Sequence, residues 1–253
     1  MKNLISRRNL LGALLVMASV PASAGLFDGW SNGNAVNGSG TIQKQDRALS
    51  NFKGVDLALP AKLELRQGDK EAVQVETDDN LQALIETVVE SGVLKIRSAD
   101  KKRYPATKVL NIVVYLKNLD HVAVSGSGKI TTDKLATRDF QAVIGGSGDI
   151  QIKTLQADEV KVSIGGSGNF VAGGSASQLN GKIGGSGSIS TGRLETKNVS
   201  IKIGGSGEAE VWAKETLDVS IGGSGDITYY GDPKVTKSIG GSGKITRKAA
   251  APV

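Results

Sequence analysis

A four-residue string recurs through the second half of the chain at a nearly constant interval. Gly-Gly-Ser-Gly begins at residues 145, 165, 184, 204, 222 and 240, and the variant Ser-Gly-Ser-Gly begins at residue 125. Successive strings are therefore 20, 20, 19, 20, 18 and 18 residues apart, and an outlying copy, Asn-Gly-Ser-Gly, occupies residues 37–40. A fixed period of this size is typical of a solenoid, in which each repeat forms one coil that stacks on the next.

The residues that flank each string indicate β-structure. The position before the string is β-branched in all seven copies, the position two after it is apolar, and mostly polar residues alternate with these positions. A period of two is the pattern of a β-strand, so each repeat predicts a strand, a tight turn, a second strand and a looser return. Coils stacked about 4.8 Å apart align these positions into two buried ladders. The ladders comprise Val124, Ile144, Ile164, Ile183, Ile203, Ile221 and Ile239, and Ile130, Ile150, Phe170, Ile189, Ala209, Ile227 and Ile245.

The predicted fold is therefore all-β: a single-stranded parallel β-helix with a repeat of 18–20 residues per coil. The Gly-Ser strings are interpreted as corners of this helix, and not as flexible linkers or an active site. We expect their glycines to adopt positive φ where the chain turns, and their serine hydroxyls to bond within the turn or to the next coil. The corner glycines are Gly126, Gly128, Gly146, Gly148, Gly166, Gly168, Gly185, Gly187, Gly205, Gly207, Gly223, Gly225, Gly241 and Gly243.

The chain before the repeats has a less regular β pattern. Residues 36–119 are expected to form irregular β coils with longer connections, and residues 120–247 the regular coils of the same domain. The string Asn-Leu-Gln-Ala-Leu-Ile-Glu at residues 80–86 is the one helical candidate, with Asn80 as its cap. Residues 248–253 form a tail. We expect residues 244–253 to leave the last coil and to cover its open edge with their charges and proline.

The N-terminus has the features of an export signal. Residues 1–24 combine a basic start, an apolar run from Leu10 to Val20 and the cleavage pattern Ala22-Ser23-Ala24, and residues 25–35 form a lead segment. The pair Arg7 and Arg8 fits either a twin-arginine signal or an ordinary secretory signal. We therefore expect an exported protein in the periplasm, on the cell surface or outside the cell. The chain has no Cys, which excludes disulfides and thiolate metal sites.

The charge balance argues against a nucleic-acid partner. The formal net charge is +6, and cleavage of the signal removes three basic residues, which leaves 6 − 3 = +3. Nucleic-acid recognition requires basic residues clustered on one face. The only basic run, Ala-Asp-Lys-Lys-Arg-Tyr-Pro at residues 99–105, is interpreted as a solvated loop.

Several segments together resemble one bacterial family. They are Gly38-Ser39-Gly40, Phe52-Lys53-Gly54-Val55, the strings LELRQGDKEAVQVETDDNL, VESGVLKIRS and LKNLDHVAVSGSGKI, and the later Gly-Ser-Gly corners, and they cover residues 36–247. The sequence resembles the head GIN domain family of auto-transporter adhesins. The resemblance implies a right-handed parallel β-helix, like pectin lyase in shape, with no established catalytic activity and with a role in cell adhesion.

The column that follows each corner could support two kinds of chemistry. It contains Lys129, Asp149, Asn169, Ser188, Glu208, Asp226 and Lys244. A calcium ladder needs oxygen ligands on every rung, and lysines stand at both ends of this column, so no metal or other cofactor is expected. Glu208 and Asp226 lie on adjacent coils, where two carboxylates could serve a carbohydrate-active enzyme. A solvated surface column is the preferred interpretation. His121 is interpreted as a boundary residue without a catalytic partner.

A second column, five places after each corner, contains Trp212 and Tyr230 on neighbouring coils. By alternation it should face outward, where an exposed aromatic pair could stack on a sugar or a partner protein, or could shield the end of the stack. Shielding of the end is the preferred interpretation. The sequence thus predicts a non-catalytic adhesion or binding module with an unidentified carbohydrate or protein ligand. The alternatives are a carbohydrate-active β-helix enzyme and a purely structural envelope protein. A homo-oligomer is left open.

Overall fold

The computed structural model describes residues 34–249, a range in which every element is a β-strand except the 3₁₀ helix η2 (Asp79–Leu84). No helix in this range is both long and apolar enough to span a membrane. The expected signal segment, residues 1–24, lies outside the described residues, as do residues 25–33 and 250–253. The strands are β1 (Asn34–Asn37), β2 (Ile42–Arg47), β3 (Gly54–Leu57), β4 (Lys62–Gln67), β5 (Ala72–Asp78), β6 (Ile85–Glu90), β7 (Val93–Ser98), β8 (Arg103–Ala106), β9 (Asn111–Leu116), β10 (His121–Val124), β11 (Lys129–Ala136), β12 (Asp139–Ile144), β13 (Asp149–Ile164), β14 (Asn169–Ile183), β15 (Ser188–Ile203), β16 (Glu208–Ile221), β17 (Asp226–Tyr230), β18 (Lys234–Ile239) and β19 (Ile245–Arg247).

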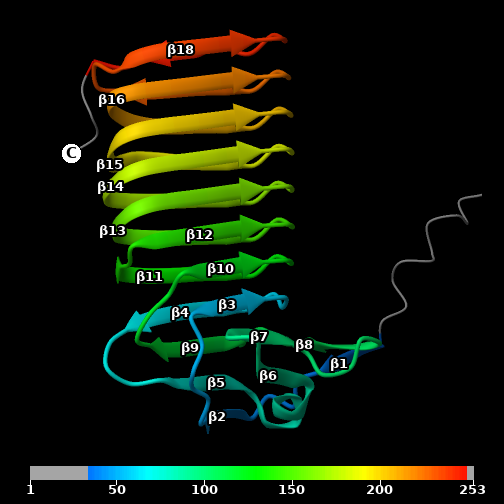
Figure 1. Cartoon of the computed structure of the whole chain (residues 1–253). Coiled ribbons are helices and arrows are strands. Elements are labelled where there is room, and N and C mark those ends of the chain that lie inside the picture. The colour runs from blue at the N-terminus through cyan, green and yellow to red at the C-terminus, as the bar shows by residue number, and fades with distance from the viewer. Residues whose placement is uncertain (1–33, 250–253) are drawn as a thin grey trace, which may run out of the picture. The chain divides into compact units, whose positions relative to one another are not determined.

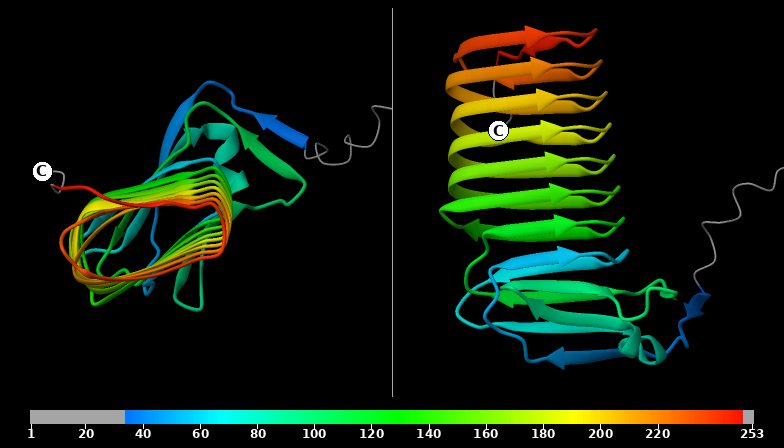
Figure 2. Two further views of the ribbon diagram at one scale, coloured as in Figure 1. Left: turned by 90° about the horizontal axis from the view of Figure 1, so that it is seen from above. Right: turned by 45° about the vertical axis from the view of Figure 1, so that its right-hand side comes forward.

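The repeats stack as a parallel β-solenoid, which confirms the predicted fold (Figure 1). Equivalent residues of successive repeats are direct partners, as in the run Ile144, Ile164 and Ile183. Seen along the stack, the coils superimpose as a flattened oval with a sheet on each long side (Figure 2). The five isoleucines before the corners at 145, 165, 184, 204 and 222 are each at most 2% exposed, which confirms the predicted ladder at these positions, whereas its last member, Ile239, is 41% exposed.

The corner glycines are required for a reason other than the predicted one. The positive-φ glycines of the described chain are Gly40, Gly92, Gly174 and Gly231, and none of them is a corner glycine. Instead, a Cβ on Gly166 would overlap the carbonyl oxygen of Gly146 in the coil below, and the other corners repeat this close approach. Stacked corners therefore need glycine for space and not for φ.

The corner serines also act differently from the prediction. The bond between stacked corners is made by the serine backbone, since the Ser167 N–H donates to the Gly146 carbonyl at 3.1 Å. The side chain of Ser167 is exposed to solvent. The backbone of each corner thus continues the inter-coil hydrogen bonding of the flanking strands, and the corner remains part of the stack.

The N-terminal coils do not stack in the order of the sequence. The coil formed by β3 and β4 lies between the first regular coil, β10 and β11, and a coil formed by β7 and β9. Antiparallel pairs then close this end, with β6 on β7, β5 on β9 and β2 on β5. Residues 36–119 are thus partly solenoid coils and partly an antiparallel cap. The predicted helix exists only as η2, and Asn80 lies inside η2 and does not cap it.

The C-terminal coil remains part of the stack. β18 pairs with β16, and β19 pairs with β17, so residues 245–247 do not leave the coil as predicted. Val235 is 36% exposed and Ile239 is 41% exposed, which means that the described tail does not cover this edge. In β18 and β19, however, Lys237 and Arg247 occupy columns that are apolar in the coils below. Two cations thus stand at the positions by which the last coil continues these columns, and the Arg247 guanidinium is paired with Asp232 at 3.0 Å.

Candidate functional site

The sheet that follows the corners loses its regular register at neighbouring positions in three successive strand pairs, and β15 and β16 shift once more after Thr196. Between β13 and β14 the register shifts after Ile152, between β14 and β15 after Val171, and between β15 and β16 after Thr191. These shifts arise because successive coils have different numbers of residues between the corner and the return. A shift in pairing leaves residues without a partner and bends the strand locally. Three shifts side by side therefore disturb an otherwise flat outer face.

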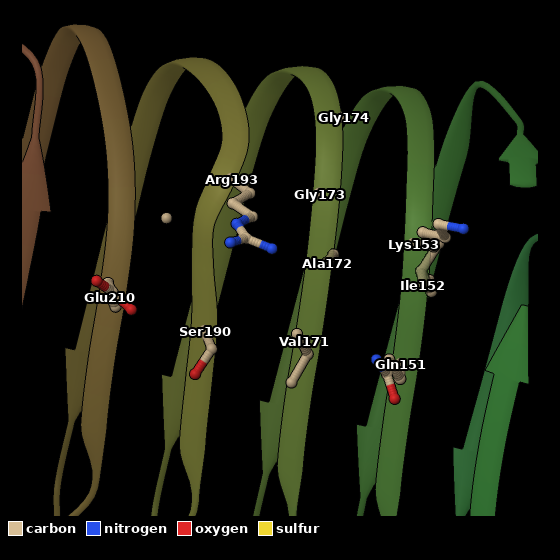
Figure 3. Close-up of a pocket in the computed structure, with 11 residues that line it drawn as sticks. Gln151, Ile152, Lys153, Val171, Ala172, Gly173, Gly174, Ser190, Arg193 and Glu210 are labelled. Atoms are coloured by element: carbon tan, nitrogen blue, oxygen red, sulfur yellow. The ribbon is translucent and has the colours of Figure 1, made fainter. Parts of the chain in front are cut away.

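A hollow of ≈ 490 Å³ lies at these shifts, and we call it the bulge hollow. It crosses four successive coils, and Gln151, Val171, Ser190 and Glu210 follow one another across its outer surface (Figure 3). Val171 is 39% exposed, which provides an apolar surface at the centre. The lining residues are Gln151, Ile152, Lys153, Val171, Ala172, Gly173, Gly174, Ser190, Gly192, Arg193 and Glu210.

Glycines form the floor of the bulge hollow where other coils carry side chains. Gly173 lies between the backbone of Lys153 and the Cβ of Arg193, at 3.0 and 3.4 Å from an added Cβ. Gly174 has φ +113°, and a Cβ there would overlap the backbone of the coil below. The depth of the hollow therefore depends on residues that cannot be enlarged without moving the backbone.

The charges around the bulge hollow are unevenly compensated. Glu210 accepts a hydrogen bond from the Tyr230 hydroxyl at 2.5 Å, and the Lys248 ammonium lies 3.5 Å from the same carboxylate. The bond to Glu210 raises the pKa of Tyr230, and contact with Tyr230 and Glu210 raises the pKa of Lys248. Within residues 34–249, neither Lys153 nor Arg193 forms an ion pair. The hollow is thus left with two uncompensated cations.

Trp212 and Tyr230 do not form an exposed stacking pair, and the position of Tyr230 beneath Lys248 agrees better with the other interpretation, in which they shield the end of the stack. Trp212 and Tyr230 are direct partners on adjacent coils, as the spacing predicts, but Tyr230 is only 5% exposed. Its ring lies against Gly192, whose added Cβ would be 2.9 Å from the Tyr230 Cε2 atom, and Lys248 lies 5.6 Å from the ring centroid. The ring therefore forms part of the surface beside the bulge hollow and presents no free face for stacking. Trp212 is half-buried and does not line the hollow.

The predicted carboxylate pair lies apart from the bulge hollow. Glu208 and Asp226 are partners on adjacent coils, but neither is among the lining residues. Asp226 accepts the backbone N–H of Lys244 at 2.8 Å, so it joins the last coil to the one below. Lower in this column, Asn169 donates to Asp149 at 2.8 Å, which makes it a hydrogen-bonded surface ladder. In the part of the chain that the structure describes, no cluster of three or more His, Cys, Asp or Glu side chains could hold a metal.

A second hollow of ≈ 570 Å³ lies at the starts of β10 and β12 and beside Glu159 and Lys161 in the middle of β13. His121 lines it, and its Nε2 is 3.2 Å from the Asp56 carboxylate. Asp139 and Glu159 are partners on adjacent coils here, and each carboxylate lies 2.8 Å from a cation of its own. Carboxylates held in exposed ion pairs are typical of a solvated surface and are not arranged as an acid and a base.

The residues of the bulge hollow were not predicted from the sequence, although a signal was present. The repeat interval changes from 20 to 19 and then from 20 to 18 where the hollow forms. In the column five places after the corner, Gly173 and Gly192 interrupt a series of larger residues. A shorter coil between longer ones must shift register, and a glycine in an outward column must leave a gap. Together these two irregularities locate the hollow.

Comparisons with known proteins agree on the fold. The profile of the family described as "Putative auto-transporter adhesin, head GIN domain" matches residues 51–233. A solved structure named a putative adhesin, from Bacteroides fragilis, is 24% identical with a TM-score of 0.79 and covers 84% of this chain and 100% of its own. One from Parabacteroides distasonis, named a putative lipid binding protein, is 27% identical with a TM-score of 0.74 and covers 85% of this chain and 100% of its own. A putative adhesin from Parabacteroides merdae is 20% identical with a TM-score of 0.67, over 85% of this chain and 100% of its own. No curated protein matches the chain.

Proposed function

The chain belongs to the family of putative auto-transporter adhesins with a head GIN domain, and on this premise we propose that it is an exported, non-catalytic binding module. We propose further that its ligand is an acidic sugar, held in the bulge hollow by Arg193 and Lys153. The periplasm, the cell surface and the medium are the compartments in which such a module would act. Fractionation of cells that express the tagged full chain tests the export.

The observation that carries this proposal is the pair of cations beside a glycine floor. Lys153 and Arg193 stand one coil to either side of Gly173, which at the spacing of paired strands separates their backbones by roughly 10 Å. Arg binds carboxylate groups through two parallel hydrogen bonds, and Lys adds a second positive charge. Gly173 adds no side chain between them, so an acidic group above it could bind Arg193, and the Lys153 side chain, which extends away from Gly173 toward the preceding coil, would turn to join it (Figure 3).

The rest of the bulge hollow suits a sugar better than a wholly apolar ligand. Gln151 and Ser190 offer hydrogen-bonding groups to hydroxyls, and Val171 offers a small apolar surface to the C–H face of a ring. Binding sites of small molecules commonly combine an apolar surface with a few convergent polar groups. The hollow is open on one side, which suits one unit of a longer chain.

Two features support a binding role over catalysis or a purely structural role. The carboxylates near the hollows are engaged, Glu210 by Tyr230 and Lys248, and those of the second hollow by their own cations. A structural solenoid, in turn, needs no break in its register, yet three consecutive coils keep one here. Departures from regular pairing that disturb an otherwise consistent fold are expected at functional sites.

Calorimetric titration of the chain that begins at residue 25 tests the ligand class. We expect an oligomer of galacturonate to bind, the neutral galactose oligomer of equal length not to bind, and salt to weaken the interaction. Arg193→Gln should lower the affinity by about tenfold or more, because a hydrogen bond to a charged group is lost. Lys182→Gln removes an exposed lysine from the strand before a corner and should leave the affinity unchanged.

Three results would contradict the proposed ligand. Equal affinity for the neutral and the acidic oligomer would show that the two cations do not recognise the acidic group. Equal losses in Arg193→Gln and Lys182→Gln would indicate binding by net charge and not by the bulge hollow. Release of new reducing ends from the oligomer during the titration would favour the carbohydrate-active enzyme over the binding module.

A further inference from the structure

The basic run that the sequence predicts to be a solvated loop forms an ordered tip of the molecule. We call Lys101, Lys102, Arg103 and Tyr104 the basic tip. All four side chains are exposed. The tip begins the short sheet of β1 and β8, which projects beyond the stacked coils in both views (Figures 1 and 2). Within the described residues, no segment covers these four side chains.

Hydrogen bonds hold the tip in one conformation. The Asp100 carboxylate accepts the Lys102 N–H at 2.8 Å, and the Ser98 hydroxyl donates to the Arg103 carbonyl at 2.6 Å. The Asn34 N–H donates to the Lys102 carbonyl at 2.8 Å, which ties the tip to β1. Three cations are therefore displayed together on a hydrogen-bonded turn, so less backbone entropy is lost when they bind.

The cations of the tip are not compensated by ion pairs. Within residues 34–249, none of Lys101, Lys102 and Arg103 pairs with a carboxylate. By contrast, the nearby Arg97 is paired with Glu86 at 2.6 Å and Glu90 at 2.8 Å. The tip thus keeps a net positive charge that is available to an anionic partner.

An exposed aromatic side chain accompanies this charge. Tyr104 is 48% exposed, more than Ile42, Val171, Val235 or Ile239, the other large apolar side chains at the surface. Its partner across the sheet is Ala35, which is also exposed and adds no charge. Tyrosine is favoured at membrane–water interfaces, where its ring lies among the headgroups and its hydroxyl stays in water.

We propose that the basic tip docks the protein on an anionic phospholipid surface. Basic side chains next to an amphipathic aromatic ring match a layer of phosphate headgroups over an apolar interior. A nucleic acid is a poorer match, because three cations on one turn neutralise few phosphates and the chain is expected to be exported. Docking at the tip leaves the bulge hollow, on the stacked coils, free for its own ligand.

Vesicle co-sedimentation with the chain that begins at residue 25, which keeps every described residue, tests this proposal. We expect binding to vesicles that contain phosphatidylglycerol, weakening with salt, and no binding to pure phosphatidylcholine. At about fivefold for each basic residue near the surface, the triple variant K101Q/K102Q/R103Q should lose roughly 100-fold in vesicle affinity. Tyr104→Ala should lower the binding that remains at high salt severalfold.

A matched control separates the tip from net charge. K182Q/K197Q/K202Q removes the same number of positive charges from exposed lysines on the regular coils and should bind vesicles like the unaltered chain. Equal losses in the two triple variants would overturn the proposal, as would unchanged binding in K101Q/K102Q/R103Q with an unchanged melting temperature. Tighter binding to duplex DNA than to the anionic vesicles, lost in the same variant, would assign the tip to a nucleic acid instead.

Discussion

The two ends of one core column lie in opposite environments. Ile96 of β7 and Ile239 of β18 belong to the same ladder, which runs from coil to coil through Leu57 and the isoleucines before the corners. Ile96 is 0% exposed because β6 pairs with the outer edge of β7, whereas Ile239 is 41% exposed because no strand follows β18 in the described chain. A solenoid residue is therefore buried by the neighbouring coil and not by its own repeat.

The two ends are also closed by different means. At the N-terminal end the strand direction reverses, so antiparallel strands replace the next parallel coil on both faces. At the C-terminal end the backbone edge remains parallel, and Lys237 and Arg247 stand in apolar columns. Charges pointing into core positions are a known defence of exposed sheet edges, because a second chain would have to bury them. One end is thus covered by structure, and we expect charge to protect the other.

The largest expected difference is between equivalent isoleucines at the two ends. Ile96→Ala should lower the free energy of unfolding by about 2–5 kcal/mol, because it opens a cavity in a closed core. Ile203→Ala, in the middle of the stack, should cost the same. Ile239→Ala should cost less than about 1 kcal/mol, since much of its side chain is already in water. Urea denaturation measures all three, and equal costs at Ile96 and Ile239 would contradict the difference in burial.

Replacing a corner glycine with alanine should also cost more stability in the middle of the stack than in its last coil. Gly166→Ala places a Cβ against the Gly146 carbonyl between two coils, and overpacking of this kind costs about 1–3 kcal/mol or more. Gly241→Ala makes the same contact in the last coil, which has no coil above it and can move away at lower cost. Gly165→Ala is the control, because no heavy atom lies within 4 Å of its added Cβ. The melting temperature, measured by thermal unfolding, should be lowest for Gly166→Ala, higher for Gly241→Ala and highest for Gly165→Ala.

Replacing the lysine at the exposed edge of the last coil should change the oligomeric state and leave the free energy of unfolding unchanged. Lys237→Val continues the apolar column of β18 and should allow two copies to pair through their last coils, seen as a concentration-dependent shift in size-exclusion chromatography. Lys234→Val removes an equal charge from an exposed position in the same strand and should remain at the elution volume of the unaltered chain. If both variants elute alike, the position of the lysine in the core column has no protective role.

The smallest expected effect concerns the N-terminal cap and its dependence on pH. The Thr107 hydroxyl and the Gly40 N–H both donate to Asp78, and these bonds lower the pKa of its carboxyl. An acid whose pKa is lower in the folded state stabilises the fold above its unfolded pKa, about 3.9, and this contribution is lost as pH falls through the folded value. Thr107→Val should therefore be less stable than the unaltered chain at pH 7, with a difference that narrows below about pH 4. A constant difference across this range would contradict the linkage.

Much of the fold could be predicted because the repeat is a local signal. The β-branched residue before each corner, as in Ile164 and Ile203, and the alternation around it specify strand, face and spacing together. The bulge hollow was missed because its residues are ordinary by type, and only the change in interval and the glycines Gly173 and Gly192 mark it. The outlying string at residues 37–40 is not a corner of the stack, since Gly38 leaves room for the Asp78 side chain.

The sequence by itself determined the coil, its corners and the buried isoleucine ladder, because each repeat exposes an apolar row that only an identical neighbour can cover. Tertiary structure alone decided the order of the N-terminal coils and the burial of Tyr230. β3 and β4 entered the stack between strands that come later in the chain, and the Tyr230 ring found its space over Gly192 of a distant coil. Sequence periodicity indicates which residues share a column. The bulge hollow, the order of the N-terminal coils and the burial of the Tyr230 ring depend instead on which segments meet in space.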